Sequence, residues 1–278
     1  MAIPRDFRTR IRHVLRSISD ALEPNPPRFP VAAAPDQRFT FNIAGIALEL
    51  PHNALTPRLW RALAEGWYEK AELEAITALL QPDDVVLELG AAIGFVSAFV
   101  ARQPGIGRVV AVEANPRLLP LARRTHELNG TGAMVEVVNA VVTADADEAD
   151  FYLAEDFWAS SMRPIPTAER VRLPARPLVS LLTEVRPSVL IVDIEGGEAE
   201  LFQGTQLPGV RAVVMELHPE FVGLEGVARA FAHLAQAGLT YDPALSCRHV
   251  VVFARPQTMA RTAITPDAVC EMVPPHTG

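Results

Sequence analysis

Several features are scarce in this chain of 278 residues, and each scarcity excludes a class of protein. There are two cysteines, Cys247 and Cys270, too few for a disulfide framework or a zinc site, so we expect a reducing, cytoplasmic setting. No apolar run reaches the ~20 residues that a membrane-spanning helix needs. Lys and Arg number 25 against 33 Asp and Glu, and the net charge of −8 argues against a general nucleic-acid-binding protein.

The N-terminal residues differ in character from the rest. Residues 3–18 place apolar side chains at helical spacing with arginines between them, which predicts a basic amphipathic helix. Such a helix could lie on the inner membrane surface, dock on a partner or pack on its own domain. Residues 24–35 carry five prolines and predict a semi-rigid spacer. We therefore expect three parts: helix and linker (1–37), a main domain (38–255) and a loose C-terminal tail (256–278).

The main domain shows the alternation of an α/β fold. The stretch RFTFNIAGIALELP alternates on both sides of Ala44–Gly45 and predicts a β-hairpin, and residues 57–80 fit one or two helices. From Val85 onward, apolar strand-like runs alternate with helical segments, which predicts a doubly wound, mostly parallel sheet covered on both faces. The expected strands are 85–89, 108–113, 134–139, 189–193, 210–217 and 248–254, with an extra pair near 149–153 and 171–179.

The first strand of this sheet ends in an acid and a glycine turn, VVLELGAAIG. Gly90 and Gly94 would let a ligand approach the backbone, although helix–strand packing alone could also explain both. Glu113, about 20 residues downstream at the end of the next strand, is suited to bind ribose hydroxyls. A nicotinamide site usually has a third, middle glycine, and Glu88 would repel a pyrophosphate. The pattern therefore favours a phosphate-free nucleoside with a cationic end, S-adenosylmethionine.

Five segments of the chain resemble the FkbM family of class I S-adenosylmethionine-dependent methyltransferases. They are EGWYE (65–69), ELGAAIG (88–94), VEANP (112–116), IVDIEGGE (191–198) and ELH (216–218), in the family's order. The resemblance covers about residues 40–254 and departs at Glu88 and Ala92, where the family usually has Asp and Asn.

This resemblance implies a seven-stranded Rossmann-like sheet and O-methyl transfer to a hydroxyl of a saccharide, glycolipid or polyketide-like acceptor. Glu69 would contact the cofactor; alternatively, it would lie at the solvent-exposed start of a helix. The cofactor positions that the resemblance implies are Glu88, Gly90, Gly94, Glu113, Asn115, Asn139 and Glu69.

A second acidic cluster follows two later strands. Asp193 and Glu195 come at the end of one strand, and Glu216 and His218 end its neighbour, so these four side chains are expected to converge beside the methyl donor. Three interpretations remain open. The favoured one is general-base work by Asp193 or His218; a divalent metal is a possibility that we do not favour. The third is structural, with Glu195 and Glu198 capping the helix after Gly196–Gly197 and Glu216 paired with an arginine.

Residues 151–164 predict a loop over the site. Phe157 and Trp158 could stack on a sugar or lipid face, and Ser160 or Ser161 could bond a hydroxyl; aromatic packing on the sheet edge is the alternative. Two other functions stay open: a binding or assembly module without catalysis, and, less favoured, a nicotinamide-dependent oxidoreductase. The acceptor and the oligomeric state are not indicated by the sequence.

Overall fold

The computed structural model describes residues 28–154, 160–164 and 167–256. The helix predicted at 3–18, the spacer before residue 28, Phe157, Trp158 and the tail from residue 257 lie outside these ranges. No helix among the described residues is long and apolar enough to cross a membrane.

The domain begins with the predicted hairpin. Strands β1 (Arg38–Ile43) and β2 (Ile46–Pro51) pair antiparallel around a turn in which Ala44 and Gly45 have φ of 48° and 80°. Two central residues with positive φ give the turn a twist that matches the strands. A short 3-10 turn, η1 (His52–Ala54), leads to α2 (Pro57–Ala64) and α3 (Lys70–Leu79). The hairpin and the two-helix version of 57–80 are confirmed.

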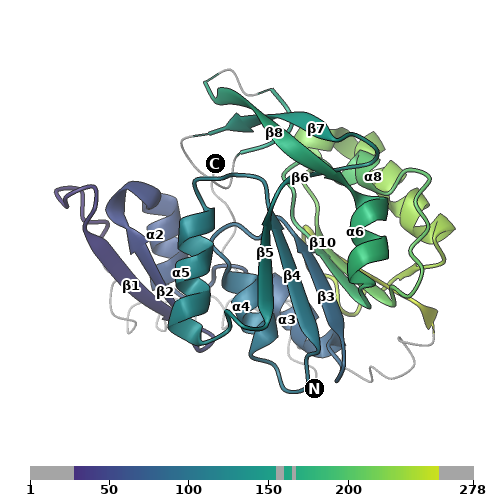
Figure 1. The fold of residues 1–278 in the computed structure, drawn as a ribbon, viewed down its shortest axis with the longest axis horizontal. Helices are drawn as coiled ribbons and strands as arrows, with labels where there is room; N and C mark the ends of the chain where they lie inside the picture. The colour runs from purple at the N-terminus through teal and green to yellow at the C-terminus, as the bar shows by residue number, and fades with distance from the viewer. Residues whose placement is uncertain (1–27, 155–159, 165–166, 257–278) are drawn as a thin grey trace, which may run out of the picture.

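A seven-stranded sheet forms the centre of the molecule, in the order β11-β12-β10-β9-β3-β4-β5 (Figure 1). The five strands from β10 to β5 run parallel, whereas β12 is antiparallel to β10 and β11 is antiparallel to β12. The fold is the doubly wound, mostly parallel sheet that the sequence predicted. Its strands are β3 (Val85–Leu89), β4 (Arg108–Glu113), β5 (Val135–Asn139), β9 (Val189–Val192), β10 (Ala212–Glu216), β11 (Thr240–Tyr241) and β12 (Val250–Ala254).

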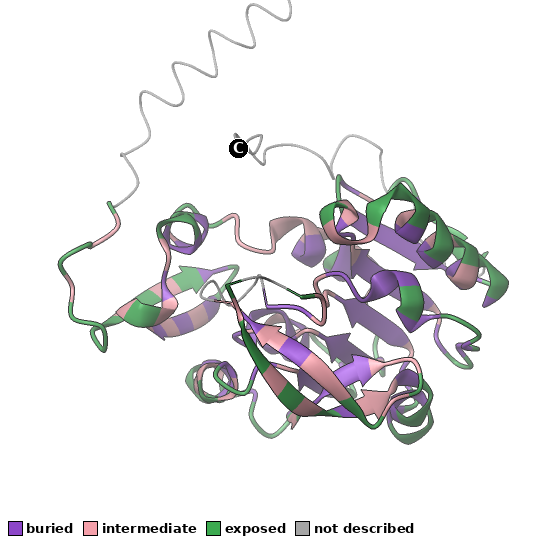
Figure 2. Ribbon diagram, turned by 90° about the horizontal axis from the view of Figure 1, so that it is seen from above, coloured by how far each residue is buried: buried purple, intermediate pink, exposed green. Residues whose placement is uncertain are grey.

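Alternating side chains of this sheet feed two separate cores. Val86 of β3 packs in the core that contains the hairpin, α2 and α3, whereas its neighbour Leu87 packs against the helices of the opposite face. Both faces are covered, which is why the central strands are apolar throughout and buried in Figure 2. The remaining helices are α4 (Phe95–Ala101), α5 (Leu119–Asn129), α6 (Leu178–Val185), α7 (Glu198–Leu201) and α8 (Pro219–Gln236).

A second, three-stranded sheet lies at the carboxyl ends of the parallel strands. It has the order β6-β8-β7, formed by β6 (Val141–Thr143), β7 (Glu148–Leu153) and β8 (Glu169–Pro177). β6 begins two residues after β5 ends, so this sheet is attached at the edge where ligands bind in open α/β folds (Figure 1). The extra strand pair expected from the sequence corresponds to β7 and β8.

Candidate active site

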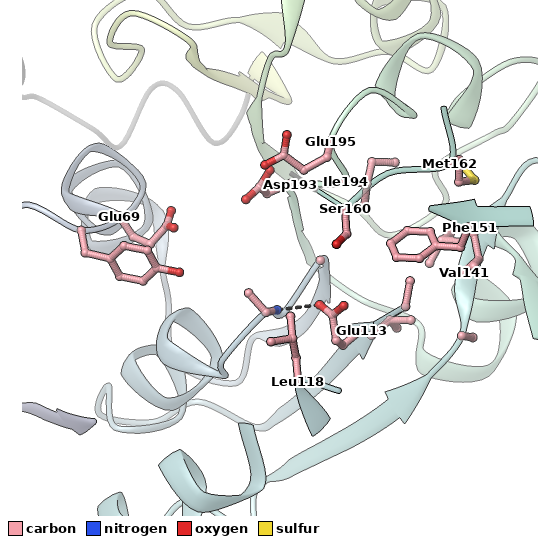
Figure 3. Close-up of a pocket in the computed structure, with 17 residues that line it drawn as sticks. Glu69, Glu113, Leu118, Val141, Phe151, Ser160, Met162, Asp193, Ile194 and Glu195 are labelled. Carbon is pink, nitrogen blue, oxygen red and sulfur yellow. Dashed lines mark hydrogen bonds between the residues drawn. The ribbon is translucent and has the colours of Figure 1, made fainter. Parts of the chain in front are cut away.

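A pocket of about 660 Å³, open to solvent on one side, lies between the carboxyl ends of β3, β4 and β9 and the small sheet (Figure 3). One side is apolar and the other carries carboxylates. Figure 3 shows Glu113 on the side of β4, with Asp193 and Glu195 on the opposite side and Glu69 facing them across a gap. Its lining residues are Tyr68, Glu69, Gly90, Ala92, Val112, Glu113, Ala114, Leu118, Ala140, Val141, Val142, Phe151, Ser160, Met162, Asp193, Ile194 and Glu195.

The glycine turn after β3 is shaped by packing as well as by the pocket. A Cβ on Gly90 would lie 1.6 Å from the carbonyl oxygen of Asp193, and one on Gly94 would lie 3.0 Å from the Cα of Ala122 in α5. Both glycines also have positive φ, 91° and 74°. Packing within the protein therefore accounts for both glycines by itself. Gly90 lines the pocket, and Gly94 does not.

Glu113, at the end of the neighbouring strand β4, is hydrogen-bonded to the glycine turn. Its two carboxylate oxygens accept hydrogen bonds from the backbone N–H of Ala92 (2.7 Å) and of Asn115 (2.6 Å). Burial raises the pKa of Glu113 to about 7, although these backbone donors oppose the rise. The carboxylate is thus fixed in place at the pocket wall, as a ribose-binding acid would have to be.

Three other residues predicted at the cofactor lie near the turn but do not line the pocket. Glu88 is 2% exposed within β3, and burial raises its pKa to about 8. Asn115 is buried, and its side chain accepts the N–H of Arg117 (3.0 Å). Asn139 ends β5 and donates to the carbonyl oxygens of Glu113 (2.8 Å) and Ala114 (2.9 Å). In this structure, Asn115 and Asn139 hold the loop after β4.

Backbone strain is concentrated at the pocket. Glu69, Ala92 and Glu195 all line it, and all have positive φ, at 53°, 44° and 51°. A residue other than glycine in this region costs roughly 1–3 kcal/mol, and such residues gather at functional sites. Asn tolerates this conformation better than Ala, which gives a conformational reason for the Asn that the family usually has at position 92.

His218 lies at the centre of the second acidic cluster. Its Nδ1 is 2.8 Å from Oε1 of Glu198, a side chain only 1% exposed. Its Nε2 is 3.2 Å from Glu195 and 3.6 Å from Asp193. Oxygens of Asp193 and Glu216 and a nitrogen of His218 all lie within 4.8 Å of one another. The four residues predicted to converge are therefore brought together.

The structural interpretation of this cluster needs correction at Glu198. Glu198 makes no side-chain cap bond to α7; it accepts the N–H of Gly196 (3.1 Å) and faces His218, because it points inward at the start of the helix. The pairing of Glu216 with an arginine stays a prediction. The Glu216 carboxylate lies within 4.8 Å of those of Glu69 and Glu72.

Burial and neighbouring charges shift the pKa values of Asp193, Glu195, Glu216 and His218. Burial raises the pKa of Asp193 and of Glu216 to about 7 and that of Glu195 to about 9. Burial alone would lower the pKa of His218, but the hydrogen bond to Glu198 and the nearby carboxylates outweigh it and raise that pKa to about 10. Titratable groups perturbed this far mark a candidate active site.

The two serines predicted to contact substrate differ in position. Ser160 lines the pocket, and its Oγ accepts the N–H of Ala154 (3.1 Å). Ser161 is fully buried outside the lining, where its Oγ donates to the carbonyl oxygen of Glu195 (2.5 Å). Ser161 therefore holds the turn that presents Glu195, and Ser160 is the serine that a substrate could reach.

Comparison with known proteins places this geometry in a family. The family described as "Methyltransferase FkbM domain" matches residues 88–238, more than half of the chain, and the match spans the glycine turn, Glu113 and the acidic cluster. The chain belongs to the FkbM methyltransferase family. The family is one of methyltransferases, which argues against the nicotinamide-dependent oxidoreductase.

Individual similar proteins were found as well. The chain is 34% identical over 138 residues to the ribosomal RNA small subunit methyltransferase A of Rubrobacter xylanophilus, covering 48% of this chain and 46% of the relative. The chain thus spans about half the length of that relative. Among solved structures, the M. jannaschii TYW2 in complex with AdoMet is 14% identical over 80% of this chain and 87% of its own, with a TM-score of 0.47. The precorrin-6y C5,15-methyltransferase of Geobacter metallireducens is 18% identical over 63% and 72%, with a TM-score of 0.39.

The pocket of this FkbM protein fits S-adenosylmethionine. Leu118, Ala140 and Phe151 form an apolar surface for the adenine ring of the cofactor. The fixed carboxylate of Glu113 offers acceptors for the ribose hydroxyls. None of the described lining residues is a cation that could bind a phosphate. When bound, the cofactor supplies a methyl group on a cationic sulfur. The carboxylate of Glu69 lines the same pocket, where it would attract that positive charge.

One residue and one contact of the site were not found from the sequence. Glu72 was passed over, although its spacing of three from Glu69 would place both on one side of a helix. The hydrogen bond between Glu198 and His218 joins residues 20 apart, on two different elements. A pairing of this kind has no local signal in a single sequence.

Proposed function

We propose that this methyltransferase transfers the methyl group to a hydroxyl oxygen of a saccharide, glycolipid or polyketide-like acceptor. The observation that carries the proposal is the pair of carboxylates, Asp193 and Glu195, on the pocket wall opposite Glu113. Methylation of a hydroxyl releases one proton, so an oxygen acceptor needs a base beside it. Carboxylates on this wall supply that base.

Within this proposal, Asp193 takes the proton from the acceptor hydroxyl. It lines the pocket, whereas His218 lies behind it with Nε2 3.6 Å from the Asp193 carboxylate. Glu198 holds the other ring nitrogen and thereby fixes the imidazole. His218 and Glu198 are then positioning residues. Glu195 and Glu216 contribute to the electrostatic potential at Asp193. Alignment of the reacting atoms supplies the larger part of the rate, up to ~7–11 kcal/mol, and the base ~10²–10⁴-fold.

The acceptor in this proposal carries no phosphate near the reacting hydroxyl. The name of the Rubrobacter relative points to RNA, but phosphates would meet a wall of carboxylates here, and the whole chain has a net charge of −8. RNA-binding surfaces are basic instead. A pocket with a largely apolar lining also suits a small acceptor. Ser160 would bond a neighbouring hydroxyl of such an acceptor.

The test is transfer of a labelled methyl group from S-adenosylmethionine to a cell extract, followed by separation into saccharide, lipid, small-molecule, RNA and protein fractions. We expect label in one of the first three fractions, in a linkage that resists alkali as an ether does. Asp193→Asn should lose most of this transfer while retaining cofactor affinity in calorimetry. Label confined to RNA, or to nitrogen or carboxyl groups, would overturn the proposal.

A further inference from the structure

We propose that Asp193, Glu216 and His218 bind one hard divalent cation at the inner edge of the pocket. One oxygen of each acid and one ring nitrogen of His218 lie within 4.8 Å of one another. Two ligands at about 2.0–2.6 Å from the same ion are separated by at most about 5 Å, so all three atoms can reach one ion. The acids and the histidine sit at or just after the carboxyl ends of β9 and β10, paired parallel strands that fix their spacing.

The orientation of His218 is the one that a metal ligand needs. Nδ1 faces the buried carboxylate of Glu198 at 2.8 Å, which leaves Nε2 directed toward Asp193 and Glu195. A histidine that binds a metal almost always has its other ring nitrogen donating to a carboxylate or carbonyl, which fixes the tautomer and the ring. Glu198 fills that position here.

A separate observation comes from α3. Glu72 is 8% exposed and has no hydrogen-bond or ion-pair partner from another described residue, yet its carboxylate lies within 4.8 Å of those of Glu69 and Glu216. Glu72 therefore lies beside Glu216, one of the three ligands. A buried carboxylate without a partner is costly, and an ion beside Glu216 would offset that cost.

The carboxylates around His218 also favour a cation. Asp193, Glu195 and Glu216 gather around its ring, and Nε2 lies 3.6 Å from Asp193 and 3.2 Å from Glu195. Asp193 Oδ1 is buried and accepts no hydrogen bond. A divalent ion supplies two positive charges at the point where the carboxylates converge.

The ligand atoms determine which ions suit the site. Two carboxylate oxygens and one imidazole nitrogen, without a thiolate, match Mg²⁺ or Mn²⁺. Asp193 has a second oxygen, which stays free to accept a proton at the pocket wall. An ion at this place would lie next to an acceptor hydroxyl and lower its pKa as a Lewis acid. The site itself does not depend on the identity of the acceptor.

Manganese binding tests the inference without acceptor or cofactor. The full chain, stripped with a chelator, is titrated with Mn²⁺, and free Mn²⁺ is followed by electron paramagnetic resonance alongside calorimetry. We expect one Mn²⁺ per chain with a dissociation constant below ~1 mM. Glu216→Gln and Asp193→Asn should each weaken binding at least ~tenfold, because each removes a charged ligand.

Glu220→Gln is the matched control, since Glu220 is an exposed acid four residues from Glu216 and belongs to neither group of ligands. The affinity of the Glu220→Gln protein for Mn²⁺ should equal that of the unaltered protein. Thermal melting verifies that each variant is folded. If Glu216→Gln does not fold, the Mn²⁺ affinity of Asp193→Asn tests the inference. Absence of Mn²⁺ binding, or equal binding by all three variants, overturns the inference. Because no methyl transfer is measured, this outcome would leave the proposed reaction standing.

Discussion

Replacement of Glu88 by glutamine should make the protein more stable at neutral pH. Glu88 is 2% exposed in β3, and its Oε2 accepts no hydrogen bond. Burial, the largest cause, raises the pKa of this carboxyl group from an ordinary value of 4.5 to about 8. The folded protein therefore retains a proton that the unfolded chain loses.

The sign and size of the effect follow from this difference. The stabilising contribution of protonated Glu88 is fully present below pH 4.5 and is lost as the pH rises to about 8. Each pKa unit corresponds to ~1.4 kcal/mol, so about 3 kcal/mol is lost by pH 7 and about 5 kcal/mol by pH 8. Glutamine cannot ionise. Glu88→Gln should thus gain up to ~3 kcal/mol at pH 7 and change little at pH 4.5.

Urea unfolding at pH 5, 7 and 8, followed by circular dichroism, measures this gain. Glu225→Gln, which removes an exposed carboxylate on α8, is the control and should track the unaltered protein. A Glu88→Gln protein that is less stable at pH 7, or whose advantage does not grow from pH 5 to pH 8, would refute the reasoning. Calorimetry on the same variant measures its affinity for S-adenosylmethionine. Stability gained without loss of affinity would refute the role of Glu88 at the cationic end of the cofactor.

Three further changes act on the glycine turn. Glu113→Gln should weaken S-adenosylmethionine binding roughly 10- to 150-fold, the equivalent of one charge-assisted hydrogen bond, and unchanged affinity in calorimetry would contradict the ribose assignment. Ala92→Asn should raise the free energy of unfolding by ~0.5–1 kcal/mol, because Asn tolerates the φ of 44° better than Ala; a lower melting temperature would count against this. Gly90→Ala should abolish soluble expression, since its Cβ would lie 1.6 Å from the carbonyl oxygen of Asp193, and recovery of this variant as a folded, soluble protein would disprove that packing.

The sequence predicted the larger elements of the fold because their signals are local. Alternation around Ala44–Gly45 specified the hairpin, and the apolar runs specified the long strands of the central sheet. Strands β6 and β11 were not predicted, because three and two residues are too few for a period to be visible. The last long helix begins at Pro219 and is interrupted at Gly223, whose φ and ψ of 65° and 173° are not helical.

Prediction of the site succeeded where side chains follow strands and failed where contacts are long-range. Asp193 and Glu216 end adjacent parallel strands, so their meeting follows from topology. The side chain of Glu198 points toward His218 because of the way α7 packs against α8. This packing leaves no periodic signal in the sequence. The cofactor roles of Glu88, Asn115 and Asn139 stay predictions.

The two sides of the pocket are joined through the backbone. Gly90 follows β3 and Asp193 follows β9, and the N–H of Asp193 donates to the carbonyl of Leu89 at 2.9 Å. Because a Cβ at position 90 would collide with the Asp193 carbonyl, the glycine sets how closely the two strand ends approach. In the proposed reaction, this rigid parallel pair would fix the distance between the methyl donor and Asp193. The glycine turn and the acidic segment, about 100 residues apart in the chain, therefore line one pocket.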